Sequence, residues 1–507
     1  MVTYKQEIKS KVRHQIIKNA VNLLTTNRSN SCCVRRSYVR DIYDYYKDCS
    51  ESHEQNEIKK IDVEYIKEWE RMHTTSIGRK SPEELSVCYL SGPEPENDFL
   101  EFVSMGVKPQ NIWAFESEKN IYLHALSSIN SSDFMQPKLI KGTIEHYFET
   151  SPKTFDIVYI DACGSLVSDQ HALRCISTLF EYQRLNSPGI LISNFSFFDD
   201  YNDTNCLEYI DMIAKYNVLH SNENVNLYNI LSSSDDFNLE IEKTIRNSDE
   251  AYGNFITAMI CNCASIAIPT YRFCASNYLR HLSSSDMHQR LNLSLFDVDS
   301  IKNNTLYKYF ALNYYAENSE NSFNANCVMK KLLKEICGKE KKMDYLICAN
   351  KIHSIRSCSI DICDDVKDIL DFFDGENMYQ FLDKPNRILF YDSVINQLAY
   401  PMHYVCDKAQ RIMYKAKQKK MFTDLLLFDG CRYIYDWMPP IHQITSAFSN
   451  PSWQYTYRFA LDGLIKQRMN YNNEFFFQGS VVSKNNSGFE AKYMPPRSDY
   501  INGGRDL

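Results

Sequence analysis

Glycine and proline are scarce in this chain, at 15 residues each among 507, which excludes collagen-like and linker-dominated architectures. No uninterrupted apolar run approaches the roughly 20 residues that a membrane-spanning helix needs. Residues 1–7 lack the apolar region of a secretory signal. We therefore expect no membrane segment and a cytoplasmic location. With 44% hydrophobic and 24% charged residues, the composition is that of a globular protein of roughly two to four packing units.

The cysteines are scattered, and the closest pairs are Cys32-Cys33, Cys261-x-Cys263 and Cys358-x4-Cys363. The 17 cysteines include no Cys-x-x-Cys, and neither a disulfide framework nor a zinc site is indicated by their spacing. His403, Asp407 and His442 lack the spacing of a helical metal motif. We expect reduced, mostly buried thiols and no structural metal.

The net charge of -8 argues against a basic coat for nucleic acid. Residues 1–50 are nevertheless locally basic, with ten Lys and Arg against four acidic residues. Apolar residues from Ile8 to Leu24 recur at helical spacing, which predicts an amphipathic helix. We expect a basic helical segment over residues 1–80. Its polar face would either touch phosphates or an acidic partner, or simply face solvent.

Residues 81–235 have a different pattern, in which short apolar runs alternate with helical segments. The order predicts an α/β fold with a Rossmann-like, doubly wound parallel sheet. The run at Phe155–Ile160 is apolar on both faces, as in a central strand. The other expected strands are Val87–Leu90, Ile112–Phe115, Lys138–Ile140 and Gly189–Ser193.

Ligands of such sheets bind outside the carboxyl ends of the strands. Ser91 and Gly92 follow the first strand, where a glycine turn lets backbone N–H groups approach a charged ligand. Glu116 follows the second strand, where one carboxylate can accept hydrogen bonds from both hydroxyls of a ribose. The pattern indicates a nucleoside-type cofactor. Each feature alone also fits an ordinary turn or a helix cap.

Residues 84–198 resemble the core of the class I S-adenosylmethionine-dependent methyltransferases. The resemblance places Ser91 and Gly92 at the methionine end of the cofactor and Glu116 at its ribose. It places Gly142 and Thr143 near the adenine. The run Asp161-Ala162-Cys163-Gly164-Ser165 is similar to the Asp-Pro-aromatic-Gly-Ser loop of some tRNA guanine N-methyltransferases, which implies that Asp161 and Gly164 belong to the catalytic loop.

The sequence departs from that pattern in three places, one of which is Thr143, where the family usually has an acidic residue at the adenine turn. Glu94-Pro95-Glu96 stands where the family has further glycines, and Ala162 and Cys163 replace the proline and the aromatic residue. Two functions therefore stay open. One is an S-adenosylmethionine-dependent methyltransferase acting on a nucleic acid amino group. The other is a non-catalytic scaffold or ligand sensor in a larger protein assembly, for example in antiviral defence. Another nucleotide-using enzyme on this fold is a third.

The remaining chain is expected to be mainly helical over residues 236–480, with an irregular tail over 481–507. Lys408, Arg411, Lys415 and Lys419 are spaced by three, four and four residues, which puts them on one face if they lie on a helix. Tyr404 and Tyr414 are nearby, and basic residues interleaved with aromatics are typical of RNA or DNA binding. The alternative is a solvated helix face.

Overall fold

The computed structural model describes most of the N-terminal half and a C-terminal portion of the chain. The described residues are 6–48, 52–131, 137–162, 164–166, 172–197, 210, 213, 242, 246–275, 396–416, 418–440 and 443–472. Cys163, the predicted tail over 481–507 and most of the predicted helical region lie outside these ranges.

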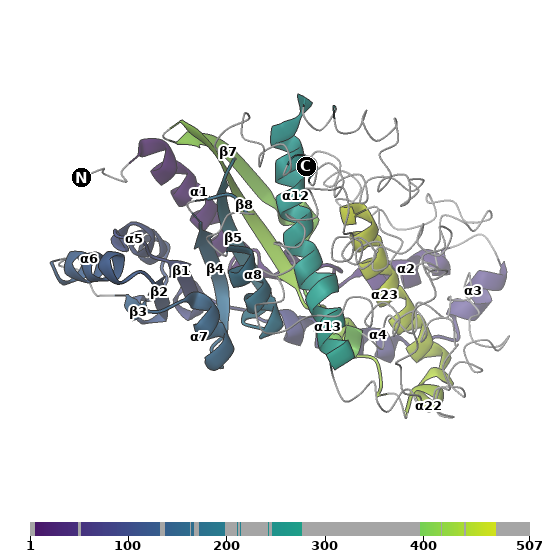
Figure 1. Ribbon diagram of the computed structural model, residues 1–507. Helices are drawn as coiled ribbons and strands as arrows, with labels where there is room; N and C mark the ends of the chain where they lie inside the picture. Colours follow the sequence, from purple (N-terminus) through teal and green to yellow (C-terminus); the bar gives the residue numbers. More distant parts are fainter. Residues whose placement is uncertain are drawn as a thin grey trace.

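The described part is organised around one mixed β-sheet with the strand order β3-β2-β1-β4-β5-β8-β6, in which β7 also pairs with β8 (Figure 1). Strands β1 to β5 are parallel. Their bounds are β1 Val87–Leu90, β2 Ile112–Glu116, β3 Lys138–Lys141, β4 Phe155–Asp161 and β5 Leu185–Ser196. This is the Rossmann-like α/β fold that the sequence predicts, and the reversal of strand order falls between β1 and β4.

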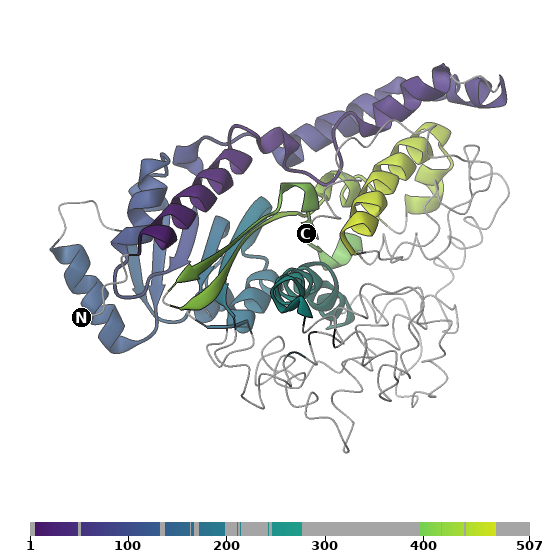
Figure 2. The ribbon, with the colours of Figure 1, turned by 90° about the horizontal axis from the view of Figure 1, so that it is seen from above.

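Helices cover both faces of the sheet. The crossover helices are α5 Glu96–Ser104, α6 Lys119–Asn130, α7 Ile144–Thr150 and α8 Ala172–Glu181. Helix α1, Glu7–Leu24, packs beside α5 and crosses β5, β7 and β8 on one face, as Figure 2 shows. Helix α8 covers the other face together with α12, Ser248–Asn262, and α13, Ile268–Ala275. Because both faces are covered, β4 is buried along its whole length up to Asp161.

The predicted helix over Ile8–Leu24 is confirmed as α1. Its buried residues, Val12, Ile16, Ile17, Ala20, Val21 and Leu24, form one stripe. Burying each of the large aliphatic ones stabilises the fold by about 1.5–3 kcal/mol. The helix is therefore held to the sheet by its apolar face.

The sheet is completed by strands from the far C-terminal part of the chain, where we had expected mainly helix. Strand β8, Lys419–Asp429, runs antiparallel to β5 and pairs with β6, His403–Tyr404, and β7, Gln410–Ala416. Gln418, just before β8, has a positive φ of 72°. The prediction of a helix carrying Lys408 to Lys419 is wrong.

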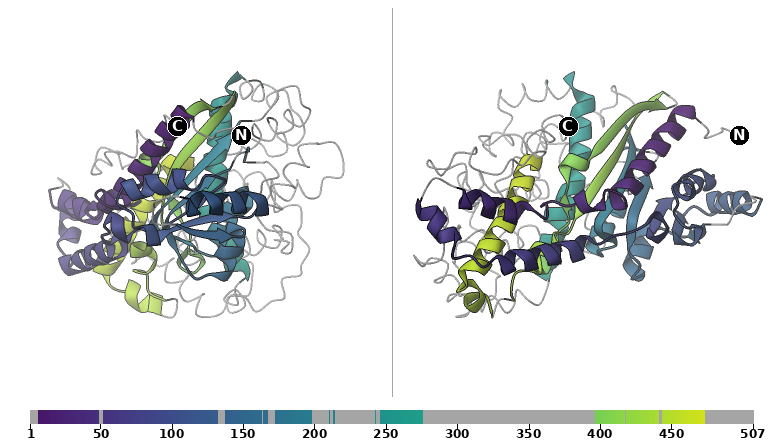
Figure 3. Two further views of the ribbon diagram at one scale, coloured as in Figure 1. Left: turned by 90° about the vertical axis from the view of Figure 1, so that its left-hand side faces the viewer. Right: turned by 180° about the vertical axis from the view of Figure 1, so that it is seen from behind.

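A helical layer beside the sheet combines helices of the N-terminal segment with helices that follow β8 (Figure 3). Helix α23, Pro451–Asn472, contacts α2 and α4 of the N-terminal segment. Trp69 of α4 and Tyr433 of α21 meet edge to face in its core, with ring centroids 6.1 Å apart. The bounds are α2 Tyr38–Lys47, α3 Ser52–Ile58, α4 Val63–Ile77, α21 Arg432–Tyr435 and α22 Ile444–Phe448.

Within the described residues, the helical run Ser248–Phe273 is long and apolar enough to cross a membrane by length and composition. However, 78% of its most apolar window is buried inside the fold. The run packs against α8 and β8, and its apolar composition is that of a helix in the core of the fold.

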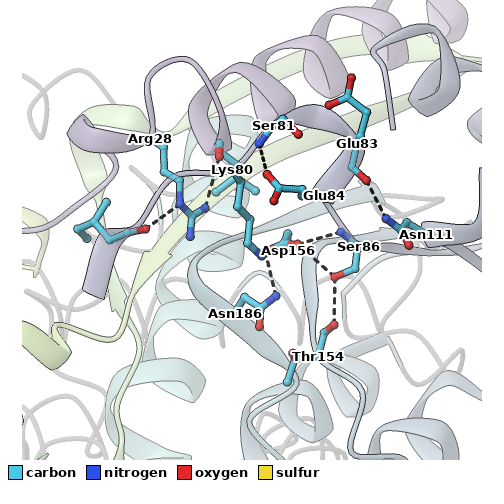
Figure 4. Close-up of polar contacts among 12 residues, drawn as sticks. Arg28, Lys80, Ser81, Glu83, Glu84, Ser86, Asn111, Thr154, Asp156 and Asn186 are labelled. Atoms are coloured by element: carbon cyan, nitrogen blue, oxygen red, sulfur yellow. Dashed lines mark hydrogen bonds and ion pairs between the residues drawn. The ribbon is translucent and has the colours of Figure 1, made fainter. Parts of the chain in front are cut away.

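One buried carboxylate links three strands on the side of the sheet where the parallel strands begin (Figure 4). Asp156, at the start of β4, accepts hydrogen bonds from the Ser86 backbone N–H at 2.8 Å and from Asn186 Nδ2 at 2.9 Å. Lys80 Nζ lies 2.5 Å from the same carboxylate. These contacts tie β1, β4 and β5 together. Asp156 is therefore a structural residue, in contrast to the carboxylates at the opposite edge.

Candidate functional site

Three adjacent turns, which follow β1, β2 and β3, meet where the parallel strands end. This side of the sheet, formed by the carboxyl ends of the strands, is its carboxyl edge. The Ser91 N–H donates to the Phe115 carbonyl, and the Gly142 N–H donates to the Glu116 carbonyl, both at 2.9 Å. Two backbone hydrogen bonds therefore fix the three turns relative to one another. The structure brings Ser91, Gly92, Glu116 and Gly142 together, as predicted from the strand ends.

Two glycines in these turns border open space. Gly92 has φ 60° and Gly142 has φ 153°, and a Cβ added to either would meet nothing within 4 Å. The positive φ of Gly92 is a conformation that side-chain-bearing residues adopt only with strain. Gly92 and Gly142 follow the strands on either side of β2, so open space borders the turns on both sides of Glu116.

The polar side chains of this edge have local partners as well. Glu116 Oε1 accepts from the Glu118 N–H at 2.8 Å, and Ser91 Oγ donates to the Gly92 carbonyl at 3.1 Å. Thr143 caps α7 by accepting from the His146 N–H at 3.3 Å. The Thr143 side chain is therefore a helix cap, and Glu116 is the residue best placed to accept from a ligand.

The turn after β1 is built differently from a glycine-rich phosphate or carboxylate cradle. Tyr89 is fully buried, and its hydroxyl donates to the Pro95 carbonyl at 2.7 Å. Pro93 and Pro95 have no N–H, so fewer backbone donors face the ligand position than in an all-glycine turn. Glu96 accepts from Ser128 Oγ of α6 at 3.1 Å.

Asp161 ends β4 and is held from two sides. Asn194 Nδ2 of β5 donates to Asp161 Oδ1 at 2.7 Å, and Lys9 Nζ of α1 lies 2.8 Å from Asp161 Oδ2. The side chains of Lys9 and Asp161 are 18% and 13% exposed. Gly164 contributes its backbone, since its carbonyl accepts from the Ser196 N–H at 3.0 Å. Asp161 is thus an oriented, largely enclosed carboxylate, paired with Lys9, at the switch point of the sheet.

A second ion pair lies next to the first. Arg13 Nε of α1 lies 2.6 Å from Asp98 Oδ1 of α5, and Asp98 is buried. Burial raises the pKa of Asp98 to about 6, and the Arg13 guanidinium opposes that rise only in part. The side chains of Lys9 and Arg13, two cations on α1, therefore both pair with carboxylates at the carboxyl ends of the strands.

Sequence reasoning missed Lys9, Arg13 and Asn194 as site residues. Lys9 and Arg13 are spaced by four residues and continue the buried stripe through Ile16 and Ala20. Basic residues that extend an apolar stripe are the signal that could have revealed them. Asn194 lies inside a buried strand, where a polar amide needs specific partners.

The predicted basic stripe does not form, because its residues lie on an edge strand, a 3-10 turn and the β8 strand. Lys408 pairs with its neighbour Asp407 at 2.6 Å. Arg411 points inward: its Nε lies 2.6 Å from Asp424, and a second guanidinium nitrogen donates to the Gly253 carbonyl at 2.6 Å. Only Lys415 and Lys419 of the four are exposed.

One group of side chains in the described part of the chain has the composition of a metal site. The ligand atoms of Cys33, Asp429 and Cys431 lie within 4.8 Å of one another and are buried. Both Asp429 oxygens already accept from protein donors. These donors are the Cys33 N–H at 2.9 Å, the Cys431 N–H at 2.9 Å, Tyr433 Oη at 2.7 Å and Ser187 Oγ at 3.2 Å. The Asp429 carboxylate therefore accepts four hydrogen bonds, and the one from Cys33 connects the N-terminal segment to the end of β8.

No protein-family model matches the chain, and no curated protein matches it. Among solved structures it is similar to one from Staphylococcus aureus described as a "putative caffeoyl-CoA O-methyltransferase". The identity is 14%, the match covers 45% of this chain and 90% of that chain, and the TM-score is 0.20. A likeness at this level assigns no role to any residue here, and the Rossmann-like fold follows from the strand order itself.

Proposed function

We propose that the carboxyl edge of the sheet binds S-adenosylmethionine and that the protein transfers its methyl group to an amine held at Asp161. The observation that carries the proposal is the open space at Gly92 and Gly142 on either side of the Glu116 carboxylate. Gly92 would border the methionine end of the cofactor, Glu116 would accept from its ribose, and Gly142 would border its adenine.

The residues at this edge fit a methyl transfer. The bound cofactor supplies a methyl group on a sulfonium, which is already activated, so the protein mainly has to align the acceptor and exclude water. Asp161, oriented by Asn194, can hold an ammonium and take up its proton. The amino group of a nucleic acid base is one acceptor class that this proposal admits.

Calorimetry with S-adenosylmethionine and S-adenosylhomocysteine tests the binding step. Gly92→Ala should abolish the binding heat, because its Cβ enters the space proposed for the ligand. Gly78→Ala is the matched control, since Gly78 has a similar φ of 66° and lies at the end of α4, in a different part of the chain from the three turns. Absence of heat with the wild-type protein up to millimolar cofactor would refute the proposal, as would equal losses in both variants.

A second candidate function is a non-catalytic sensor of the same cofactor. It is favoured by the two prolines in the turn after β1 and by the engagement of both Asp161 oxygens, one by Lys9 and one by Asn194. Radiolabelled methyl transfer separates the two candidates. Binding heat without transfer to any protein or nucleic acid acceptor supports the sensor, and transfer supports the enzyme.

A further inference from the structure

The ammonium of Lys9 lies where the proposed reaction needs an amine. Its Nζ is 2.8 Å from Asp161 Oδ2 at the carboxyl end of β4. The cofactor proposed above would lie over the neighbouring ends of β1 and β2, which flank β4 on one side in the strand order. A primary amine of the chain itself is therefore delivered to the acceptor side of the site.

The position of Lys9 is fixed by the rest of α1. One turn further along α1, Arg13 pairs with the buried Asp98 of α5. His14 Nδ1 of α1 lies 2.9 Å from Glu101, which is also on α5. Further along, the buried stripe from Ile16 to Leu24 packs on the sheet. The amine is presented by a rigid element, which lowers the entropic cost of bringing it to a reacting partner.

We propose that Lys9 is a site of self-methylation, with its ε-amine as the methyl acceptor. This inference rests on the proposed function. The Lys9 ammonium first gives a proton to water, while its nitrogen stays beside the Asp161 carboxylate. The free amine nitrogen then forms a bond to the methyl carbon while the carbon–sulfur bond breaks, and the electron pair stays on the sulfur of the departing thioether. The product is a protonated methyl-lysine, and its positive charge stays beside the Asp161 carboxylate.

The modified chain would keep the contacts that hold α1 in place. A methylated lysine retains its positive charge, so the ion pair with Asp161 persists after transfer. The surrounding charges also remain balanced, because Lys9 and Arg13 face Asp161 and Asp98. The phenols near the pair, the buried Tyr159 and the half-buried Tyr414, remain neutral because burial raises the pKa of each.

Lys11 provides an internal control on the same helix. Its side chain is 70% exposed and pairs with Glu7, which is 82% exposed. A non-specific chemical methylation would modify Lys11 more readily than Lys9, since Lys11 is freely accessible. A reaction directed by the site would modify Lys9 alone.

The first experiment incubates the wild-type protein with S-adenosylmethionine and maps methyl groups by peptide mass spectrometry. We expect one or more methyl groups on Lys9, none on Lys11, and loss of the modification in Asp161→Asn. Unmodified Lys9 in a protein that binds the cofactor by calorimetry would overturn this inference and leave the proposed function standing. Absence of binding would overturn the proposed function itself.

A second experiment does not depend on turnover. Lysines are labelled with an amine-reactive ester in the absence and presence of saturating S-adenosylhomocysteine. We expect the ligand to reduce the labelling of Lys9 and to leave that of Lys11 unchanged. Equal labelling of Lys9 with and without bound ligand would show that its amine does not border the cofactor and would overturn the inference.

Discussion

Asn194 orients Asp161 across two adjacent strands. The two residues are in register on β5 and β4, and Asn194 Nδ2 donates to Asp161 Oδ1 at 2.7 Å. The other end of the amide is also engaged, because Asn194 Oδ1 accepts from Thr423 Oγ1 of β8 at 2.8 Å. A row of hydrogen bonds therefore runs across β4, β5 and β8, and it joins the C-terminal strand to the candidate site.

Breaking this row should destabilise the fold. Asn194→Ala leaves the Thr423 hydroxyl without its amide acceptor in a buried position, which should lower the free energy of unfolding by about 1–3 kcal/mol. Urea denaturation of Asn194→Ala, Thr423→Val and the double variant gives a double-mutant cycle. We expect a coupling energy of about 0.5–3 kcal/mol, whereas simple additivity would show that the two side chains do not interact.

Glu116→Ala should weaken cofactor binding by about 1–3 kcal/mol, because the ribose hydroxyls would lose a shared acceptor. Glu118→Ala is the control. Glu118 caps α6 by accepting from the Asn120 N–H at 3.1 Å, so its removal should lower stability and spare the affinity. Calorimetric affinities for S-adenosylhomocysteine decide the matter, and an unchanged value for folded Glu116→Ala would make Glu116 a turn residue only.

The sheet core was predictable from sequence because its strands carry local signals. Phe155–Ile160 is apolar at every position but one, Asp156, and each of the strands β1 to β4 is followed by a turn and a helix. The cofactor-side turns followed from the general rule that ligands bind at carboxyl ends. Local pattern and sheet topology therefore sufficed to place Gly92, Glu116 and Asp161 at one edge.

The C-terminal strands were not predictable in the same way. The spacing of Lys408, Arg411, Lys415 and Lys419 fits a helix, and the turn that joins β7 to β8 has no glycine, although Gln418 has a positive φ. The identity of β8 as a strand depends on its pairing with β5, more than 200 residues away in sequence. Local sequence does not identify the partner in such long-range pairing, just as the stripe that Lys9 extends does not identify Asp161 as its partner.

Arg411 and Lys415 should differ sharply in their effect on stability. Arg411→Gln leaves Asp424, which is buried, without its cation. Breaking a buried pair in this way should cost about 3–5 kcal/mol. Lys415→Gln, at an exposed position of the same strand, should change stability by no more than about 0.5 kcal/mol. Urea denaturation of both variants tests this, and equal effects would contradict the inward orientation of Arg411.

Nucleic acid binding, if it uses this strand pair, should involve the two exposed lysines. Each phosphate contact contributes about 0.9 to the slope of log affinity against log salt concentration for duplex DNA. Replacing Lys415 and Lys419 together by Gln should therefore lower the magnitude of this slope by about 2. Fluorescence anisotropy with labelled DNA and RNA at several salt concentrations measures the slope. A double variant with the wild-type slope, or no binding at low salt, would remove this surface as a nucleic acid site.

Asp98 should make the stability of the protein depend on pH in a specific window. Its pKa is raised by burial to about 6 in the folded state, against about 3.9 in an unfolded chain. The folded state therefore binds the proton more tightly. The resulting stabilisation is fully present below about pH 4 and is lost as the pH rises through 6.

The shift of about two pKa units corresponds to about 3 kcal/mol, and a difference measurement isolates it. Asp98→Asn cannot titrate, so the stability of the wild-type protein relative to this variant should fall by about that amount between pH 4 and pH 7. Ser104→Ala is the control, because it removes a neutral side chain of the same helix, whose hydroxyl donates to the Glu101 carbonyl at 2.8 Å. Its stability should run parallel to that of the wild type across the window, as measured by urea denaturation at each pH. A wild-type curve that also runs parallel to that of Asp98→Asn would show that Asp98 titrates alike in the folded and unfolded chains, and the pairing with Arg13 would then fully offset its burial.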